Sequence, residues 1–284
     1  MLKRAREFTG PPAAARPAAT VVLLRPSGQA FQVYVLRRRT TMVFGGVYAF
    51  PGGVVDPSDR PTTIRSDWAA RLGVPEEQAH AVVGAAAREL FEETGVLLAA
   101  PISEPDHTVR MPPPDDLASS GGLASSGGLA SSGGLASSGG LVSSGVDGWE
   151  ADRAAVQRRE LSMTELLDRR GLRLRDDLLV PWSRWITPEF EPRRFDTWFF
   201  AALMPESQQT RDVSGEADRT AWVDPSAVAD LPMLPPTRHT LAQMAACGTP
   251  AGVITASAHR DAATPVQPQI KLTPDGQATF HLPT

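Results

Sequence analysis

Arg88-Glu89-Leu90-Phe91-Glu92-Glu93-Thr94-Gly95-Val96 carries three carboxylates within five positions and leads into a glycine. On a helix, Glu89, Glu92 and Glu93 lie on one face, with Cβ atoms about 5–6 Å apart. Each like-charged pair at this spacing costs about 0.2–0.5 kcal/mol, so a helix selected for stability alone would alternate its charges. A hard divalent cation removes the repulsion, because carboxylate oxygens suit Mg²⁺ or Mn²⁺. The stretch therefore predicts a helix that ends near Gly95 and binds a divalent metal ion through the three glutamates.

The region ahead of these residues distinguishes them from a solvated acidic helix end, which is the alternative interpretation of a bare Glu-Glu pair. Phe50-Pro51-Gly52-Gly53 has the pattern of a strand residue running into a turn. Helical periodicity then spans residues 76–94, where an apolar stripe lies opposite the acids. The stripe consists of Val82, Val83, Ala86, Ala87 and Leu90. We expect one helix both to anchor in the core and to carry the acidic site.

A Gly-Gly turn followed by a helix ending in Arg-Glu-hydrophobic-x-Glu-Glu-x-Gly-hydrophobic resembles the Nudix box of the nucleoside-diphosphate-X hydrolases. The resemblance implies an α/β fold, namely an α/β/α sandwich around a mixed β-sheet, and metal-dependent cleavage of a diphosphate bond. It makes Glu92 and Glu93 the main metal ligands, and Glu89 a third ligand or the base that takes a proton from the attacking water. Arg88 would hold the glutamates and the glycine loop by charge-assisted hydrogen bonds. The chemistry agrees, since a metal ion neutralises a diphosphate and generates and orients a hydroxide.

The first half of the box departs from the common pattern. Fourteen positions usually separate its first glycine from the arginine, whereas Gly53 lies 35 positions before Arg88, which leaves about 21 extra residues. Counted back from Arg88, the usual early glutamate falls on His80, which we expect to be structural rather than a ligand. Glu76 or Glu77, at the predicted helix start, are the candidate substitutes, and both suit the positive end of the helix dipole.

Other segments are similar to the coenzyme A diphosphatase branch of the superfamily, which contains the peroxisomal enzyme. They are residues 38–56, the long insertion inside the box, residues 185–188 and residues 193–197. This similarity implies that coenzyme A or acyl-CoA is split into 3′,5′-ADP and a 4′-phosphopantetheine product. The alternatives are hydrolysis of ADP-ribose or a dinucleotide, and a Nudix-fold protein that senses a nucleotide without cleaving it. The intact glutamates argue against a sensor.

The resemblance also suggests residues that contact substrate. Gly52 and Gly53 belong to the glycine loop. Arg38, Arg193 and Arg194 are candidates for binding phosphates through bidentate hydrogen bonds, although Arg193 or Arg194 could instead pair with Asp196. Glu216 lies in a loop where related enzymes often keep an accessory acid that orients water, and its alternative is an ordinary exposed glutamate. Three aromatic residues are expected in the core rather than as a nucleobase platform: Trp198, Phe199 and Phe200.

Composition excludes several other classes of protein. The chain has 284 residues, of which 42% are hydrophobic, enough for a core. A net charge of −4 and a pI near 5.8 argue against a nucleic-acid binder. The single cysteine, Cys247, excludes an internal disulfide and suits a reducing cytosol. Because no 18-residue apolar run or signal core occurs, we expect a cytoplasmic protein without a membrane span, acting on a small nucleoside diphosphate. The oligomeric state stays open.

We expect one domain at residues 18–248, preceded by a flexible tail at residues 1–17. Residues 117–140 repeat Leu-Ala-Ser-Ser-Gly-Gly four times. Because ordering costs about 1–2 kcal/mol per residue and the repeat buries little, residues 112–148 are predicted to be a disordered insertion rather than a β-solenoid. Strands are predicted at residues 20–24, 31–36, 193–203 and 219–223, and helices at 149–170, 225–230 and 236–246. Residues 249–284 are predicted to form a small β-like appendage.

Overall fold

The computed structural model describes residues 2–42, 44–103, 146–212, 214–272 and 278–281. Its main sheet has eight strands in the order β10-β7-β8-β1-β2-β3, and β4 also pairs with β1 and β9 with β2. The sheet is mixed, because β1 runs parallel to β8 and antiparallel to β2. The strands are β1 (Ala15–Ser27), β2 (Ala30–Arg38), β3 (Tyr48–Ala49), β4 (Gly52–Val54), β7 (Leu179–Ile186), β8 (Arg194–Leu203), β9 (Ala217–Val223) and β10 (Pro265–Val266).

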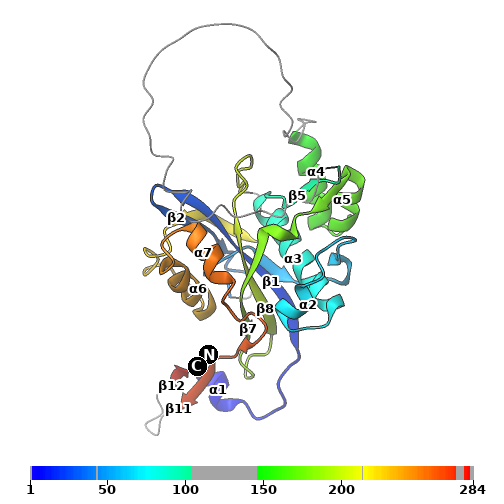
Figure 1. Cartoon of the computed structure of the whole chain (residues 1–284). Coiled ribbons are helices and arrows are strands. Elements are labelled where there is room, and N and C mark those ends of the chain that lie inside the picture. The colour runs from blue at the N-terminus through cyan, green and yellow to red at the C-terminus, as the bar shows by residue number, and fades with distance from the viewer. Residues whose placement is uncertain (1, 43, 104–145, 213, 273–277, 282–284) are drawn as a thin grey trace, which may run out of the picture.

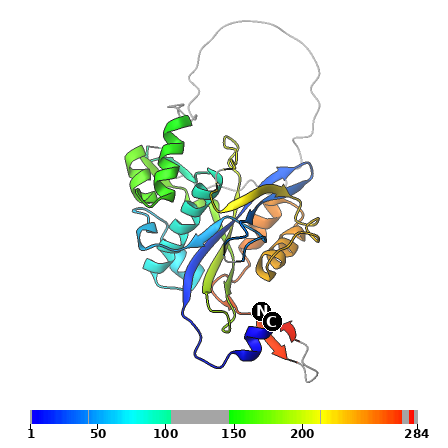
Figure 2. The same cartoon turned by 180° about the vertical axis from the view of Figure 1, so that it is seen from behind.

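Helices cover both faces of this sheet, as Figures 1 and 2 show from opposite sides. One side carries α2 (Trp68–Leu72), α3 (Glu76–Thr94), α4 (Val146–Gln157) and α5 (Met163–Arg170), and the other carries α6 (Pro235–Ala245) and α7 (Pro250–Ser257). The predicted α/β/α sandwich around a mixed sheet is therefore confirmed. The smaller elements are α1 (Leu2–Glu7), two 3₁₀ turns, η1 (Pro57–Asp59) and η2 (Asp176–Leu178), and the strand pairs β5 (Ala99–Pro101) with β6 (Leu172–Leu174) and β11 (Gln269–Leu272) with β12 (Ala278–His281).

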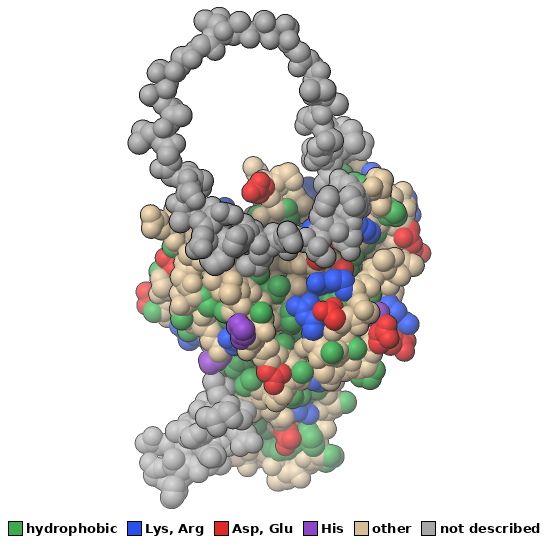
Figure 3. Space-filling view, in the orientation of Figure 1, with side chains coloured by type: hydrophobic (Ala, Val, Ile, Leu, Met, Phe, Trp, Pro, Cys, Tyr) green, Lys and Arg blue, Asp and Glu red, His purple; other side chains and the backbone are tan. Residues whose placement is uncertain are grey.

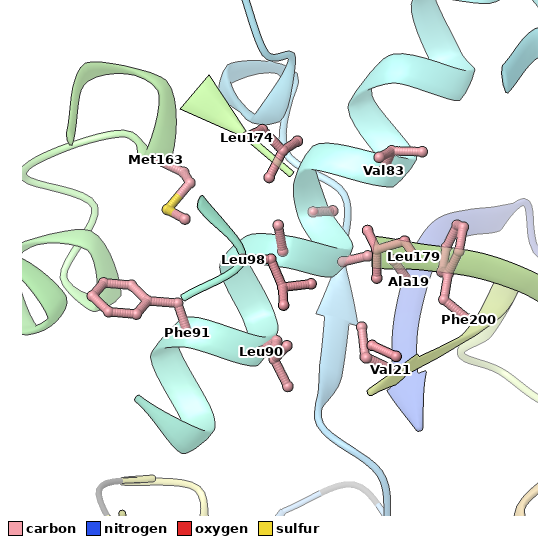
Figure 4. Close-up of a cluster of buried hydrophobic side chains, with 14 of the residues drawn as sticks. Ala19, Val21, Val83, Leu90, Phe91, Leu98, Met163, Leu174, Leu179 and Phe200 are labelled. Atoms are coloured by element: carbon pink, nitrogen blue, oxygen red, sulfur yellow. The ribbon is translucent and has the colours of Figure 1, made fainter. Parts of the chain in front are cut away.

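Two hydrophobic cores lie on opposite faces of the sheet. Val21 and Leu23 of β1 belong to the core beneath α3, whereas Val22 and Leu24 belong to the core beneath α6 and α7. Successive strand residues point to opposite faces, so a strand buried on both faces reads as a continuous apolar run. Figure 4 shows Leu90 of α3 in the first core together with side chains of β1 and β8. This packing fixes the helix that carries the acids against the centre of the sheet.

Helix α3 begins and ends where the sequence predicts. Pro75 is its N-cap residue, and Glu76 and Glu77 fill the first turn, where the helix dipole favours negative charge. At the other end, Gly95 adopts a left-handed conformation with φ 73° and donates its backbone N–H to the carbonyl of Phe91 at 2.9 Å. A glycine adopts this conformation without the strain of a side chain, so the helix stops directly after the acidic residues.

Strand β1 is longer than predicted and brings the glycine turn to the helix. Its first part pairs with β4, with Thr20 opposite Gly52 and Ala19 opposite Gly53. A Cβ atom on Gly52 would lie 2.5 Å from the Ala19 carbonyl oxygen, so only glycine permits this close approach. The pairing holds β4 beside the C-terminal half of α3.

Several predicted boundaries were wrong. Strand β1 already begins at Ala15 inside the predicted tail, and Arg4 of α1 forms an ion pair with Glu191 at 2.8 Å. Residues 104–145, which hold nearly all of the predicted insertion, lie outside the described residues, but α4 begins at Val146 rather than after residue 148. The predicted helix at residues 149–170 is two helices, because Arg159 has a left-handed backbone with φ 61° that a helix cannot accommodate. Residues 225–230 form turns and not a helix.

The predicted division at residue 248 is also not a structural boundary. Val253 of α7 is fully buried in the second core, and β10 extends the main sheet beside β7. The β-like pairing predicted beyond this point is present as β11 and β12. In the described residues, no helix combines the length and apolar character needed to cross a bilayer.

Charged side chains are mixed on the face shown in Figure 3, where Lys and Arg lie beside Asp and Glu. The chain has 28 basic and 32 acidic residues in total, so neither sign dominates. A phosphate backbone is bound by concentrated positive charge. The described side chains on this face do not form such a field.

Candidate active site

A cavity of about 830 Å³ brings together most of the predicted site residues. Those that line it are Arg38, Gly52, Gly53, Glu89, Glu92, Glu93, Arg193 and Glu216. They come from β2, β4, α3 and the loops before β8 and β9. The structure therefore gathers residues that are separated by up to 178 positions in the chain. Arg88 and Arg194 do not line the cavity.

Arg88 forms a buried charge network behind the cavity wall. Its Nε donates to Oδ1 of Asp59 at 2.5 Å and its Nη2 donates to Oδ2 at 3.0 Å. Its Nη1 donates to Glu89 at 2.6 Å and to Glu92 at 3.1 Å, and Nη2 also donates to the Val54 carbonyl at 3.0 Å. Burial opposes the charged form, but the hydrogen bond to Asp59 and the three surrounding carboxylates together raise the pKa of Arg88. The predicted geometry, with Arg88 tying the glutamates to the glycine loop, is thus present.

Asp59, the acidic partner of Arg88, was not predicted from the sequence. It lies six positions after Gly53, which is where the early acid of the box falls when counted forward from the glycine. The extra residues of the box lie between this acid and Arg88, so counting back from Arg88 by the usual spacing reached His80 instead. Forward counting from Gly53 was the signal that would have found Asp59.

The predicted substitutes for the early acid were wrong. The Glu77 side chain is 72% exposed and pairs with Arg60, and Glu76 is also exposed and lies 3.7 Å from Nε2 of His80. Neither glutamate reaches the Arg88 network. His80 does not line the cavity, in agreement with its expected structural role.

Local structure also holds Asp59 in place, in addition to its contact with Arg88. Asp56 and Asp59 form a capping box around η1, in which Oδ2 of Asp59 accepts the backbone N–H of Asp56 at 2.7 Å. The turn packs directly on α3 at Gly84, where an added Cβ atom would lie 1.7 Å from the Asp59 carbonyl oxygen. A glycine in the middle of α3 is therefore needed for the close approach that delivers the carboxylate.

The three glutamates are buried carboxylates with raised pKa values. Burial raises the pKa of Glu89 to about 7, since desolvation and repulsion by Glu92 exceed the stabilisation from Arg88. Burial likewise raises the pKa of Glu92, and burial together with the charge of Glu89 raises the pKa of Glu93 well above its usual range. Oε2 of Glu93 accepts the backbone N–H of Gly52 at 2.9 Å, which partly opposes this rise. The site concentrates negative charge that needs a positive partner.

The donor chemistry of this site fits a divalent metal ion. Three carboxylate side chains line one end of a cavity. A cation bound there would favour their charged forms and so offset the cost of removing them from water. As the side chains stand, Glu89 and Glu92 turn toward Arg88 and Glu93 turns toward Gly52. Accordingly, within the described ranges no three Asp, Glu, His or Cys side chains are gathered closely enough to enclose an ion. The role of the glutamates as metal ligands stays a prediction.

Arginines and an acid form the opposite side of the cavity. Arg38 lies 4.0 Å from Glu216, whose side chain is 54% exposed, and Arg193 is exposed at the cavity wall. Arg194 is buried and donates to the carbonyls of Thr187 and Ala13. It is therefore not available to bind substrate phosphates as predicted. Asp196 pairs with Arg184 and with neither of these arginines.

The cavity wall also contains apolar and aromatic side chains, including Phe50, Trp185, Phe195 and Phe199. Trp198 and Phe200 are fully buried in the first core, as expected for core residues. Phe199 belongs to the second core but also reaches the cavity. A pocket that combines such a wall with a few polar groups is typical of small-molecule sites.

Two lining residues, Gln157 and Arg159, were not identified from sequence. They lie in and just after α4, where a single continuous helix was predicted. The capping-box pattern of Ser162 and Glu165, which begins α5, was the signal in the sequence for a break ahead of residue 163.

Comparisons with known proteins agree with this geometry. The profile of the family described as NUDIX domain matches residues 14–117, which include β1, β4, η1 and α3. A comparison with curated proteins gave no match.

Among solved structures, a NUDIX hydrolase from Alicyclobacillus acidocaldarius is 25% identical to this chain, with a TM-score of 0.59. The match covers 89% of this chain and 99% of that protein. The NUDIX domain of Shewanella oneidensis NrtR, solved in complex with ADP ribose, is 13% identical over 85% of this chain and 90% of that one, with a TM-score of 0.40. The first similarity extends well past residue 117, so the shared fold includes the elements on both sides of the repeat.

Proposed function

Because this chain belongs to the Nudix superfamily and is a Nudix hydrolase, we propose that it cleaves the diphosphate bond of coenzyme A or acyl-CoA with the aid of Mg²⁺ or Mn²⁺. The products would be 3′,5′-ADP and 4′-phosphopantetheine or its acylated form. Nudix hydrolases act on small nucleoside diphosphate derivatives, and this proposal names one of them. A cytoplasmic location stays a prediction.

The observation that carries the proposal is the composition of one cavity. It holds the three glutamates and the glycine turn, and its wall also includes residues 185–188 together with Arg38, Arg193 and Phe195. These wall residues belong to the segments that resemble the coenzyme A branch. Coenzyme A carries a 3′-phosphate in addition to its diphosphate, and planar guanidinium groups suit such phosphates. A cavity of about 830 Å³ also lies in the size range of sites for large small-molecule ligands.

The residues of α3 would prepare the reaction. Arg88 holds Glu89 and Glu92 by charge-assisted hydrogen bonds and stabilises their ionised forms. The Gly52 N–H holds the Glu93 carboxylate in the same cavity. A divalent ion bound by these glutamates would neutralise the diphosphate and lower the pKa of water. Glu89 is the candidate to accept the proton of the attacking water, because it lines the cavity with its carboxylate against Gly53 of the glycine turn.

A panel of diphosphates assayed with Mn²⁺ tests the proposal. It should contain coenzyme A, 3′-dephospho-coenzyme A, ADP-ribose and a dinucleoside polyphosphate, with products separated by chromatography. We expect kcat/KM to be highest for coenzyme A. Equal values for ADP-ribose and coenzyme A would reject the substrate assignment, and absence of turnover on every member would reject diphosphate hydrolysis.

An Arg193→Ala variant sharpens this test. If Arg193 binds the 3′-phosphate, the variant should raise KM for coenzyme A by about 10-fold or more, the value of one charged hydrogen bond. KM for 3′-dephospho-coenzyme A should stay unchanged, because this substrate lacks the group in question. An equal rise for both substrates would place the role of Arg193 elsewhere in the cavity.

A further inference from the structure

Two described residues other than glycine have a left-handed backbone, Phe44 with φ 56° and Arg159 with φ 61°, and both line the cavity. A side chain in this conformation is unfavourable, and such residues cluster at functional sites where the surrounding structure enforces them. Both of these strained residues therefore belong to the cavity wall, which suggests a functional role, and one of them, Arg159, is charged.

The turn that carries Arg159 is tied to the catalytic helix. Arg153 of α4 is buried and donates from Nη1 to the backbone carbonyl of Glu92 at 2.8 Å. Val156, one residue before the end of α4, is fully buried in the first core, and its carbonyl accepts the Arg159 N–H at 3.0 Å. These contacts hold the backbone of Arg159 at a fixed place beside the last turn of α3.

The Arg159 side chain has no strong protein partner of its own. Nη1 lies 3.8 Å from Oε1 of Glu92, beyond hydrogen-bond distance, and the side chain is 46% exposed. Among the described residues, its guanidinium has no hydrogen bond. Such an exposed ion pair contributes little to stability, so it does not account for an enforced left-handed backbone.

The neighbouring arginine behaves differently. Arg158 is similarly exposed, but its guanidinium donates two hydrogen bonds to Glu160 at 2.8 Å, and it does not line the cavity. Two consecutive arginines thus differ in their contacts, because Arg158 pairs with Glu160 whereas Arg159 lines the cavity. The left-handed backbone of the second one turns it toward the acidic end of the cavity.

We propose that Arg159 is a phosphate-binding residue whose guanidinium contacts the diphosphate of the substrate next to Glu92. This inference rests on the proposed function in taking the ligand to be a diphosphate. Planar guanidinium donors match phosphate oxygens, and those of Arg159 face the cavity without a competing hydrogen bond. Arg159 thereby adds positive charge at the end of the cavity where the three carboxylates would otherwise repel an anion.

The test compares Arg159→Gly, Arg159→Lys and the matched control Arg158→Ala in the full chain. Binding of inorganic pyrophosphate to metal-free protein is measured by calorimetry, and melting temperature by circular dichroism. Arg159→Gly should weaken pyrophosphate binding by about 10- to 100-fold, while Arg159→Lys should retain part of the affinity. Arg158→Ala should bind as the unmodified protein does.

The melting temperature separates binding from a structural role. Glycine relieves the left-handed backbone, so Arg159→Gly should melt at the same or a higher temperature while it loses pyrophosphate. A lower melting temperature with unchanged binding would show that Arg159 is structural and overturn the proposal, as would failure of the unmodified protein to bind pyrophosphate. If the unmodified protein binds pyrophosphate through Arg159 but cleaves none of the diphosphates, the proposed function fails and the binding role stands.

Discussion

Asp59 and Arg88 form a buried ion pair that spans 29 positions of the chain and joins the two halves of the box. Each side chain is only 1% exposed, and two hydrogen bonds of 2.5 and 3.0 Å connect them. The residues between them include α2 and the part of α3 before Arg88, and both α2 and η1 pack against α3. The enlarged box therefore keeps the ion pair between its early acid, Asp59, and its arginine, Arg88.

Replacing Asp59 with asparagine should destabilise the protein by about 3 kcal/mol. Removal of one charge from a buried pair leaves the other uncompensated, although Arg88 keeps Glu89 and Glu92 as partners. Urea unfolding followed by tryptophan fluorescence measures the change. The control is Glu77→Gln, which removes an exposed acid and should shift the free energy of unfolding by less than about 0.5 kcal/mol. Equal changes in the free energy of unfolding for the two substitutions would contradict the assignment of Asp59 as the stabilising partner of Arg88.

Gly84→Ala should destabilise the protein by about 3 kcal/mol, even though alanine favours helices by about 1 kcal/mol over glycine. The new Cβ would overlap the backbone carbonyl of Asp59, which cannot move without lifting η1 from α3. Gly148→Ala in α4 is the matched control, because its Cβ would meet only the end of the Arg170 side chain at 3.4 Å. Thermal unfolding of both variants measures the difference. A stable Gly84→Ala protein would show that η1 does not need this close approach.

Gly53→Ala should have a different profile, with a smaller loss of stability than Gly84→Ala but a large loss of activity. Its Cβ would lie 2.3 Å from Oε1 of Glu89, the end of a side chain that can rotate away. Displacement of Glu89 should lower kcat by about 10²-fold, comparable to losing one positioned catalytic group. Gly10→Ala, where a Cβ meets nothing within 4 Å, is the control for kcat and melting temperature. Normal kcat in Gly53→Ala would argue that Glu89 has no role in the reaction.

Glu93→Gln should leave the fold intact and abolish most hydrolysis. The amide oxygen can still accept the Gly52 N–H, and loss of a charge that burial disfavours should not lower the stability of the metal-free protein. Loss of a metal ligand forfeits several kcal/mol of charge stabilisation, so we expect kcat to fall by at least about 10²-fold. Calorimetric titration with Mn²⁺ should show weaker binding. Unchanged Mn²⁺ affinity would exclude Glu93 as a ligand.

Local patterns were sufficient to predict the elements that depend on near neighbours. The bounds of α3 follow from apolar periodicity, the acids of its first turn and Gly95, and all of these act within one or two helical turns. The α/β/α arrangement was implied by the resemblance of the box to the Nudix family and not by local patterns alone. The glutamates, the glycine turn, Arg38 and Arg193 also line one cavity, and their roles in it stay predictions.

Contacts between distant segments could not be read from the chain alone. Asp59 was missed because the partner of a buried arginine is chosen by packing, which here brings η1 against Gly84. Arg193 and Arg194 are adjacent in sequence, but Arg194 begins β8 and donates to backbone carbonyls, so only Arg193 reaches the cavity. The left-handed backbone of Arg159 comes just after α4, which is tied to α3 by the hydrogen bond from Arg153 to the Glu92 carbonyl. Periodicity and spacing thus specified the helix and its acids, whereas tertiary packing selected the charges that surround them.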